Sequence, residues 1–368
     1  MPGVAGAEGQ PRGGARREAG IDPVCHTLVG AALARSGLGR RTGLGTATLV
    51  IGANLPDIDV LAYLDGPAAD LAFRRGWTHG IPALVVLPFV LTAAIVLFDR
   101  VVRRVGRSGL PSGVAPRAVL LLSTVAILTH PVLDTLNTYG VRWLMPLRGD
   151  WFYGDTLFIV DPWLWLMLGL GVVAAGRGRR AEGKAGSAAT RQARAALAAA
   201  AFYVLAMAGA SLAARGIARR ELSALGGPPV ERIMVGPRPL TPFVRQVVAE
   251  RGDSFLVGTF RWFERPHIEI GSLRAVRRPR PDDPALLAAR ADPTGGRFLG
   301  WARFPVVEVE PGPDGGSLVH LIDLRYADHP DAGFGTLTVA LLTPPRASPP
   351  PSGTPSPSTP TGPVAPGR

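Results

Sequence analysis

The stretch of residues 80–98 reads GIPALVVLPFVLTAAIVLF and contains no ionisable side chain. Its length and composition match the roughly 20 apolar residues that an α-helix needs to cross the hydrocarbon core of a bilayer. Residues 195–214, which read AALAAAAFYVLAMAGASLAA, have the same character. The two runs predict transmembrane helices, so we expect a polytopic membrane protein.

Two further segments are apolar, and each carries an informative exception. Residues 118–137 are long enough to span a bilayer, but they contain His130 and Asp134, which a lipid-facing surface would not tolerate. These two side chains must therefore face protein or water. Residues 162–176 are apolar with tryptophans near their start, which predicts a helix whose first turn lies in the membrane interface.

Residues 24–34 and 42–56 are shorter and contain several glycines. They fit either a tight helical hairpin or partly re-entrant segments. With the longer runs they predict a mostly α, polytopic membrane helical bundle of about six segments, spread over residues 22–215.

The composition changes after this bundle. Residues 221–342 combine Pro and Gly with alternating apolar residues, which predicts a small soluble α+β domain. Within it we expect hairpins at residues 243–263 and 304–326, and a short helix at residues 283–291.

The two ends of the chain differ from both predicted domains. Residues 1–21 are rich in Gly, Ala and Arg and show no cleavable signal peptide, and residues 343–368 are rich in Pro, Ser and Thr. Both are predicted to be disordered tails because they lack the apolar residues of a packed core. The single cysteine, Cys25, excludes an intrachain disulfide framework and is interpreted as a packing residue.

The formal net charge is +12 at pH 7. Basic residues between the apolar runs gather around residues 40–41, 100–117 and 177–194 rather than in a stripe that would suit nucleic acid. The positive-inside rule explains these clusters if they are cytoplasmic, so membrane lipid is the predicted partner and nucleic acid is not. The chain after residue 214 is then extracytoplasmic, at an inner (plasma) membrane. These patterns predict no oligomeric state.

Histidines and aspartates are few within or beside the first four segments. They are His26, Asp57, Asp59, His79, His130 and Asp134. Neutral imidazole and carboxylate are the usual ligands of zinc, manganese or iron at hydrolytic sites. The set predicts a divalent metal ion, with zinc favoured. Taken singly, each residue is better explained as an interhelical hydrogen-bonder or a helix cap, and only the set of six favours a metal site.

The spacing of these residues supports a shared site. His130 and Asp134 are four positions apart and lie on one helical face. Asp57 and Asp59 would point apart on a regular helix, but Pro56 permits an irregular backbone that turns both carboxylates inward. One carboxylate can then bind the ion while the other orients it or acts as a base. The charge-based topology places all six side chains near the outer membrane face without using them as input.

Polar neighbours surround the predicted metal ligands. Arg75, Asn137 and Tyr139 are interpreted as groups that bind a substrate or support the ligands, and an arginine here suits a phosphate ester. Contact with lipid headgroups explains the arginine equally well. Asp161 either supports the ligands or, because Pro162 follows it, simply starts the next helix.

Four motifs together are fairly specific. They are His26, Leu-Pro-Asp-Ile-Asp at residues 55–59, Arg-Gly-Trp-Thr-His at residues 75–79 and Thr-His-Pro-Val-Leu-Asp-Thr-Leu-Asn-Thr-Tyr-Gly at residues 129–140. With them, residues 22–162 resemble the YdjM-like family of bacterial inner-membrane proteins, described as metal-dependent hydrolases and in part as LexA-binding. Gly80 follows His79 where relatives often carry serine. The resemblance implies a membrane-embedded hydrolase without an established substrate, and LexA binding does not suit an outer site.

The favoured hypothesis is therefore a membrane-embedded, metal-dependent hydrolase acting on a phosphate-containing or lipid-like substrate. In this hypothesis Asp57 or Asp59 is the catalytic base for a metal-activated water. The alternative is a non-enzymatic membrane scaffold or partner-binding protein whose polar cluster holds helices together. An ion transporter ranks last, because its ionisable residues would lie deeper in the membrane.

Overall fold

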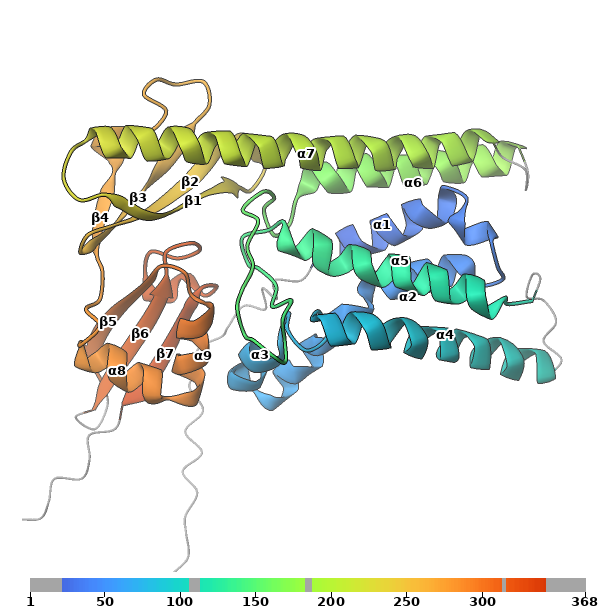
Figure 1. Cartoon of the computed structure of the whole chain (residues 1–368), viewed down its shortest axis with the longest axis horizontal. Helices are drawn as coiled ribbons and strands as arrows, with labels where there is room; N and C mark the ends of the chain where they lie inside the picture. The colour runs from blue at the N-terminus through green and yellow to red at the C-terminus, as the bar shows by residue number, and fades with distance from the viewer. Residues whose placement is uncertain (1–21, 106–112, 183–186, 313–315, 342–368) are drawn as a thin grey trace, which may run out of the picture.

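The computed structural model describes residues 22–105, 113–182, 187–312 and 316–341. A helical bundle forms one end of an elongated molecule, and a domain built from β-strands and short helices forms the other (Figure 1). The predicted tails at residues 1–21 and 343–368 lie outside the described residues.

The bundle is formed by helices of unequal length. Its elements are α1 (Pro23–Arg35), η1 (Leu38–Arg40), α2 (Gly45–Asn54), η2 (Leu55–Asp65), α3 (Pro67–Phe73), α4 (Ile81–Arg104), α5 (Pro116–Thr135), α6 (Pro162–Glu182) and α7 (Ser187–Ala224). Helix α1 packs against α2, α6 and α7, and α5 lies between α2 and α4. Helices α6 and α7 run side by side (Figure 1).

Four helical segments are long and apolar enough to cross a membrane. Among the described residues these are Gly45–Asp65, Ile81–Arg104, Pro116–Thr135 and Ser187–Ala224. A bundle of six spans is not confirmed. Helix α1 has only 13 residues, and the basic end of α6 lowers its hydropathy although the helix has 21 residues. Large apolar side chains such as Val85 and Phe89 of α4 are exposed, as expected of a surface in contact with lipid.

The second domain contains two antiparallel sheets. One has the strand order β1 (Val230–Arg238), β2 (Thr241–Arg251), β3 (Ser254–Arg261) and β4 (Arg274–Arg277), and the other has β5 (Pro305–Pro311), β6 (Ser317–Asp323) and β7 (Thr336–Leu341). Short helices connect them: η4 (Ile270–Ser272), α8 (Pro284–Ala291), α9 (Pro293–Trp301) and η6 (Pro330–Ala332). Both predicted hairpins and the helix at residues 283–291 are present. Strands β1, β4 and β7 and helix α9 had not been predicted.

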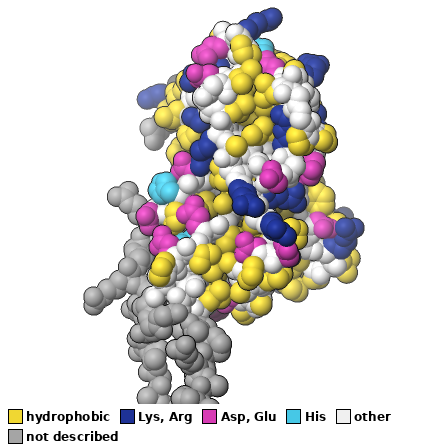
Figure 2. Space-filling view, turned by 90° about the vertical axis from the view of Figure 1, so that its left-hand side faces the viewer, with side chains coloured by type: hydrophobic (Ala, Val, Ile, Leu, Met, Phe, Trp, Pro, Cys, Tyr) yellow, Lys and Arg dark blue, Asp and Glu magenta, His cyan; other side chains and the backbone are white. Residues whose placement is uncertain are grey.

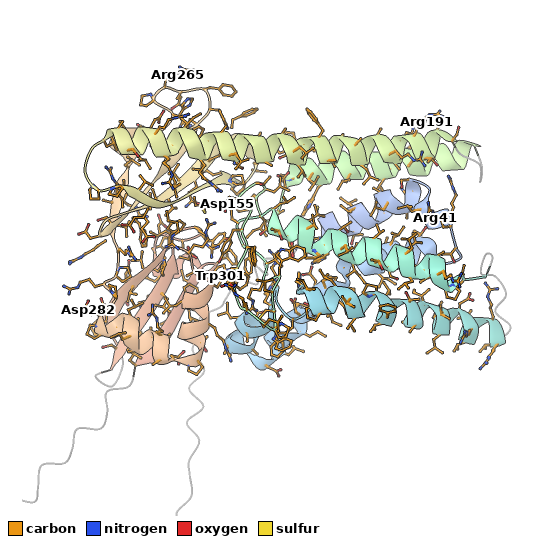
Figure 3. The ribbon with its side chains drawn as sticks, in the orientation of Figure 1. Arg41, Asp155, Arg191, Arg265, Asp282 and Trp301 are labelled. Atoms are coloured by element: carbon orange, nitrogen blue, oxygen red, sulfur yellow. The ribbon has the colours of Figure 1, made fainter. Side chains whose placement is uncertain are left out.

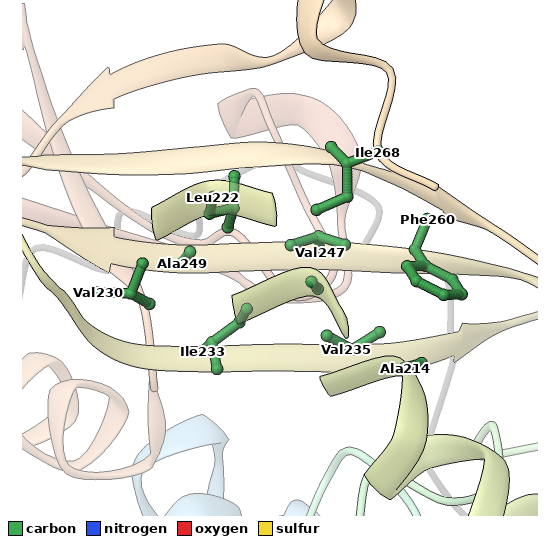
Figure 4. Close-up of a cluster of buried hydrophobic side chains, with 10 residues drawn as sticks. Ala214, Leu222, Val230, Ile233, Val235, Val247, Ala249, Phe260 and Ile268 are labelled. Atoms are coloured by element: carbon green, nitrogen blue, oxygen red, sulfur yellow. The ribbon is translucent and has the colours of Figure 1, made fainter. Parts of the chain in front are cut away.

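Helix α7 joins the two domains without a break. The apolar run ends near residue 214, but the helix continues to Ala224, because no glycine pair interrupts it before Gly226 and Gly227. Its Ala214, Ala218 and Leu222 recur every four residues and face the first sheet. They form one buried cluster with Val235 and Val247 of that sheet (Figure 4). The sheet is thereby held on a direct extension of the bundle.

The two ends of the bundle differ in charge. Arg41 and Arg191 lie at the end remote from the second domain (Figure 3). The histidines and aspartates described below lie at the opposite end, near the second domain. The bundle therefore has one basic end and one end that carries the His/Asp residues, as the sequence pattern predicts.

Candidate metal centre

Three segments of the bundle carry five of the six predicted ligands, and α1 carries the sixth, His26. Element η2 begins with Leu55 and Pro56, and its tight turns carry Asp57 and Asp59. The chain before α4 carries His79, and the last turns of α5 carry His130 and Asp134. A β-carbon at Gly80 would lie 2.6 Å from the carbonyl oxygen of Met145, so only glycine permits this close approach beside His79.

Asp57, His79, His130 and Asp134 form a group that can hold a metal ion, with one ligand atom from each within 4.8 Å of the others. The Nε2 atoms of His79 and His130 each lie 3.4 Å from Oδ2 of Asp134. Their distances to Oδ1 of Asp57 are 4.0 Å and 3.5 Å. Both imidazoles and Asp134 are buried, so the group is largely shielded from solvent.

The hydrogen bonds of the two imidazoles define their tautomers. Nδ1 of His130 lies 2.7 Å from the carbonyl oxygen of Ala53, which can only accept, so this nitrogen carries the proton. Nδ1 of His79 lies 3.0 Å from the hydroxyl oxygen of Thr78, which donates its own proton to Oδ2 of Asp59 and can therefore accept from the imidazole. The same Nδ1 lies 3.3 Å from Oδ2 of Asp59, which is also an acceptor. In the neutral rings both Nε2 atoms therefore present lone pairs to the carboxylates of Asp57 and Asp134.

These distances favour a cation bound between the imidazoles and the carboxylates over direct hydrogen bonds between them. A charged N–H to carboxylate bond is about 2.7–2.9 Å long, whereas the four nitrogen–oxygen distances are 3.4–4.0 Å. Ligand atoms at about 2.0–2.1 Å from a tetrahedral ion would lie about 3.3–3.4 Å from one another. Within the described residues, both Nε2 atoms and Oδ2 of Asp134 are buried without a hydrogen-bond partner. The donor set therefore fits a divalent ion.

His26 and Asp59 lie beside the group of four. The His26 ring stacks on His130 with 3.7 Å between ring centroids, and its Nε2 lies 3.5 Å from Oδ1 of Asp134. Oδ2 of Asp59 accepts hydrogen bonds from the Thr78 hydroxyl and from the backbone N–H of Arg75. Asp59 thus orients His79 from behind, whereas Asp57 faces the site.

The predicted substrate-binding groups Arg75 and Asn137 are directed toward the protein. The Arg75 guanidinium donates to Oδ1 of Asp134 at 3.1 Å and to the side-chain oxygen of Asn137 at 3.1 Å. The same oxygen of Asn137 accepts from the backbone N–H groups of Tyr139 and Gly140. These contacts hold the carboxylate of Asp134, a predicted ligand, and the loop after α5, which accounts for both side chains without a substrate.

Tyr139 forms an apolar wall against the arginines. The Arg75 guanidinium lies over its ring, 4.6 Å from the centroid. Burial raises the pKa of the Tyr139 phenol above its ordinary value, although Arg74 and Arg75 act in the opposite direction. The phenol is therefore neutral at pH 7.

Arg142, another arginine near the predicted ligands, is directed toward the protein as Arg75 is. Its guanidinium donates to the backbone carbonyl oxygens of Ala72 and Arg74.

Asp161 starts α6 and also borders a cavity. One of its oxygens accepts from the backbone N–H groups of Trp163 and Leu164, and the other accepts from the Tyr203 hydroxyl. The cavity has a volume of about 20 Å³ and is lined in part by His26, Asp134 and Asp161. A space of this size holds a water molecule. The cavity can thus hold a water molecule beside the predicted ligands His26 and Asp134.

The part of the chain that carries these residues matches a known protein family. A model of the family described as "YdjM inner membrane protein" matches residues 21–218, which include every predicted ligand. The chain belongs to this YdjM family.

Another comparison supplies no activity for this YdjM family protein. The Bacillus subtilis (strain 168) protein named "Uncharacterized protein YfhP" is 27% identical over 124 residues. The alignment covers 33% of this chain and 33% of the relative, so only about a third of either protein is compared. No solved structure matches the chain.

The second domain of this YdjM family protein contacts the loop beside the candidate centre, and the sequence had not indicated these contacts. The Arg325 guanidinium donates to the carbonyl oxygen of Thr138, and the Tyr326 hydroxyl donates to the Thr138 hydroxyl. The Trp301 indole donates to the carbonyl oxygen of Tyr139. More than 160 positions separate these partners, and no local pattern relates them.

A change at Asp59 is expected to weaken metal binding without removing a ligand. The substitution Asp59→Asn keeps the shape of the side chain but removes the charge that orients the Thr78 hydroxyl and faces Nδ1 of His79, so the Nδ1–H tautomer loses support. We expect about 10–100-fold weaker zinc binding, the usual effect of losing a ligand's outer partner. Competition with a chromophoric chelator measures the affinity. Asp70→Asn is the matched control, because Asp70 pairs with Arg74 instead. Equal affinities in Asp59→Asn and the wild type would refute this role.

Proposed function

We propose that this protein is a membrane-embedded metal-dependent hydrolase with zinc as its ion. The observation that carries the proposal is the convergence of two imidazole Nε2 atoms, with tautomers set by Ala53 and Asp59, on the carboxylates of Asp57 and Asp134. Two histidines with one or two carboxylates are a common zinc set in hydrolytic enzymes. Manganese and iron bind the same kinds of ligand, so they are the alternatives to zinc at this site.

The residues of the centre have different roles in this proposal, and Asp57 has two of them, one for each of its oxygens. His79, His130, Asp134 and Asp57 would hold the ion, which when bound supplies a Lewis acid and lowers the pKa of water to about 7. Oδ2 of Asp57 is buried and has no hydrogen-bond partner among the described residues, so this carboxylate is suited to accept a proton from water. Asp59 would keep His79 in the required tautomer.

The proposed location of the centre limits the classes of substrate that suit it. The centre lies near one end of the predicted spans, and the basic residues at the other end favour an extracytoplasmic site by the positive-inside rule. A site at that depth suits a lipid-like substrate. A phosphate group is less well supported than the sequence suggested, because Arg75 and Arg142 donate to protein oxygens.

A scaffold without catalysis is the second candidate. The observation in its favour is the buried ion pair between Arg75 and Asp134, since structural clusters pair their carboxylates with nearby arginines. This pair offsets one carboxylate, whereas Asp57 and Asp59 bring two more into contact with histidines. The excess of carboxylate and imidazole is the reason for preferring a metal centre.

Activity assays separate the two candidates. Purified full-length protein, stripped with a chelator and reloaded with Zn²⁺, is expected to hydrolyse at least one member of a panel of carboxylic ester, amide, phosphomonoester and phosphodiester substrates. Asp57→Asn should lower kcat by about 100-fold or more, the usual contribution of a positioned base. A zinc-loaded protein that hydrolyses no member of the panel would support the scaffold instead.

A further inference from the structure

One end of the first sheet exposes large apolar side chains. Leu240 is 72% exposed, Phe243 is 52% exposed and Phe263 is 82% exposed. The rings of Phe243 and Phe263 lie together, with 5.1 Å between their centroids. We call these three residues the aromatic edge. A contiguous exposed apolar group on an otherwise packed domain indicates a contact surface.

The aromatic edge adjoins the first turn of α6. The indole N–H of Trp163 donates to the carbonyl oxygen of Leu240 at 3.1 Å. A small cleft of this region is lined on one side by Trp163 and Tyr203 and on the other by Pro237 and Leu240. Trp and Tyr with an apolar body and a polar tip are enriched where helices enter the headgroup layer. The connection between β1 and β2 therefore lies at the level expected for the membrane interface.

The apolar surface continues from the sheet onto α7. Phe202, Leu205 and Leu212 are exposed large apolar side chains on this helix, and all three lie within the candidate span Ser187–Ala224. Met207 and Tyr203, on the intervening turns, line the cleft with the connection between β1 and β2. The aromatic edge thus adjoins a candidate span whose exposed apolar side chains are suited to contact lipid.

Other parts of the same domain have the character of a surface in water. On the face seen from the end remote from the bundle, basic and acidic side chains lie interspersed among hydrophobic ones (Figure 2). Asp282 lies far from the bundle and is exposed beside its partner Arg280 (Figure 3). The exposed phenylalanines are therefore not a general property of the domain.

We propose that the aromatic edge rests in the headgroup layer of the membrane that holds the bundle. The phenylalanine rings and Leu240 would enter the boundary between headgroups and acyl chains. Exposed Arg238, Arg261 and Arg265 near the edge suit the phosphates of phospholipids, although Glu264 lies 3.6 Å from Arg261 and offsets part of that charge. The domain is then held at the membrane by lipid as well as by α7. This proposal does not depend on the metal centre.

Lipid-attached quenchers test the position of the edge. Full-length Cys25→Ala protein carries Phe263→Cys or, as the matched control, Asp282→Cys, each labelled with a polarity-sensitive fluorophore. The protein is placed in nanodiscs of phosphatidylcholine and phosphatidylglycerol, with or without lipids bearing a nitroxide near the headgroup. We expect at least about threefold stronger quenching at position 263 than at position 282, because the nitroxide acts only at short range.

Two results would overturn the proposal. One is equal quenching at positions 263 and 282, which would place the edge in water. The other is a blue-shifted emission at position 263 without quenching by the nitroxide lipids, which would mean that protein, such as a second copy of this chain, covers the edge. A third label at Leu240→Cys repeats the measurement, so a local disturbance at position 263 does not decide the result.

Discussion

His79→Ala and His130→Ala are each expected to reduce the metal content of the purified protein to background, whereas the wild type is expected to carry about one divalent ion per chain. Each substitution removes an Nε2 donor that faces Asp57 and Asp134 at 3.4–4.0 Å. Losing a ligand should exceed the about 10–100-fold effect of losing an outer partner. Inductively coupled plasma mass spectrometry, with protein quantified in the same sample, measures the content.

An exposed histidine provides the control. His329 lies on the surface of the second domain beside Asp328, so His329→Ala should leave the metal content unchanged. Equal content in His79→Ala, His130→Ala and the wild type would show that any bound ion sits elsewhere. A wild type without metal, after purification in the presence of zinc, would remove the basis of the proposed hydrolase.

The second large effect is expected from Asp323→Ala in the second domain. The carboxylate of Asp323 lies 2.7 Å from the Arg325 guanidinium, and both side chains are fully buried. Its removal leaves a guanidinium without its counter-charge among aromatic rings such as Trp301 and Tyr326. Breaking a buried pair in this way costs about 3–5 kcal/mol of folding free energy. Because Arg325 also holds the carbonyl of Thr138, the loop beside the metal centre should loosen with the domain.

Chemical denaturation followed by tryptophan fluorescence measures this loss, since Trp301 contacts the guanidinium. The matched control is Asp282→Ala, which breaks the exposed pair with Arg280 and should change the free energy of unfolding by less than about 0.5 kcal/mol. The double substitution Asp323→Leu with Arg325→Met should recover much of the stability, because it leaves no buried charge. Equal effects of Asp323→Ala and Asp282→Ala would contradict this account.

Residue chemistry and spacing were enough to predict a candidate metal centre. His130 and Asp134 face one side of a helix because they are four apart, and the structure places their side chains 3.4 Å from each other. Asp57 and His79 come from other segments, and their inclusion depended on the predicted topology. The structure brings these four together in one group. His26 stacks beside them, outside that group.

The roles of the two aspartates could not be separated from the sequence. Both follow Pro56 and both were candidates for ligand and base. The turns of η2 direct Asp57 to the imidazole Nε2 atoms and direct Asp59 to Nδ1 of His79. The two aspartates are two positions apart, and the directions of their side chains depend on the backbone between them. Because 3₁₀ turns and a regular α-helix direct residues i and i+2 differently, the role of each aspartate can be assigned only when the backbone conformation is known.

Arg75 and Asn137 illustrate the limit of reading neighbours as substrate groups. Their residue types suit an anion, but burial beside Asp134 makes the carboxylate the nearer partner of Arg75. The oxygen of Asn137 is engaged by the loop that follows it. An arginine near a predicted metal ligand therefore needs a structure before it is assigned to a substrate.

The sequence by itself determined the membrane character, the change of composition after the bundle and the His/Asp residues that are candidate ligands, because these follow from apolar run length and from the chemistry of single side chains. Only the tertiary structure decided that α7 continues into the first sheet, that Asp59 supports His79, and that Arg325 and Trp301 hold the loop of Thr138 and Tyr139. Contacts of this kind join residues far apart in the chain, and their energy depends on burial and direction, which no local pattern encodes.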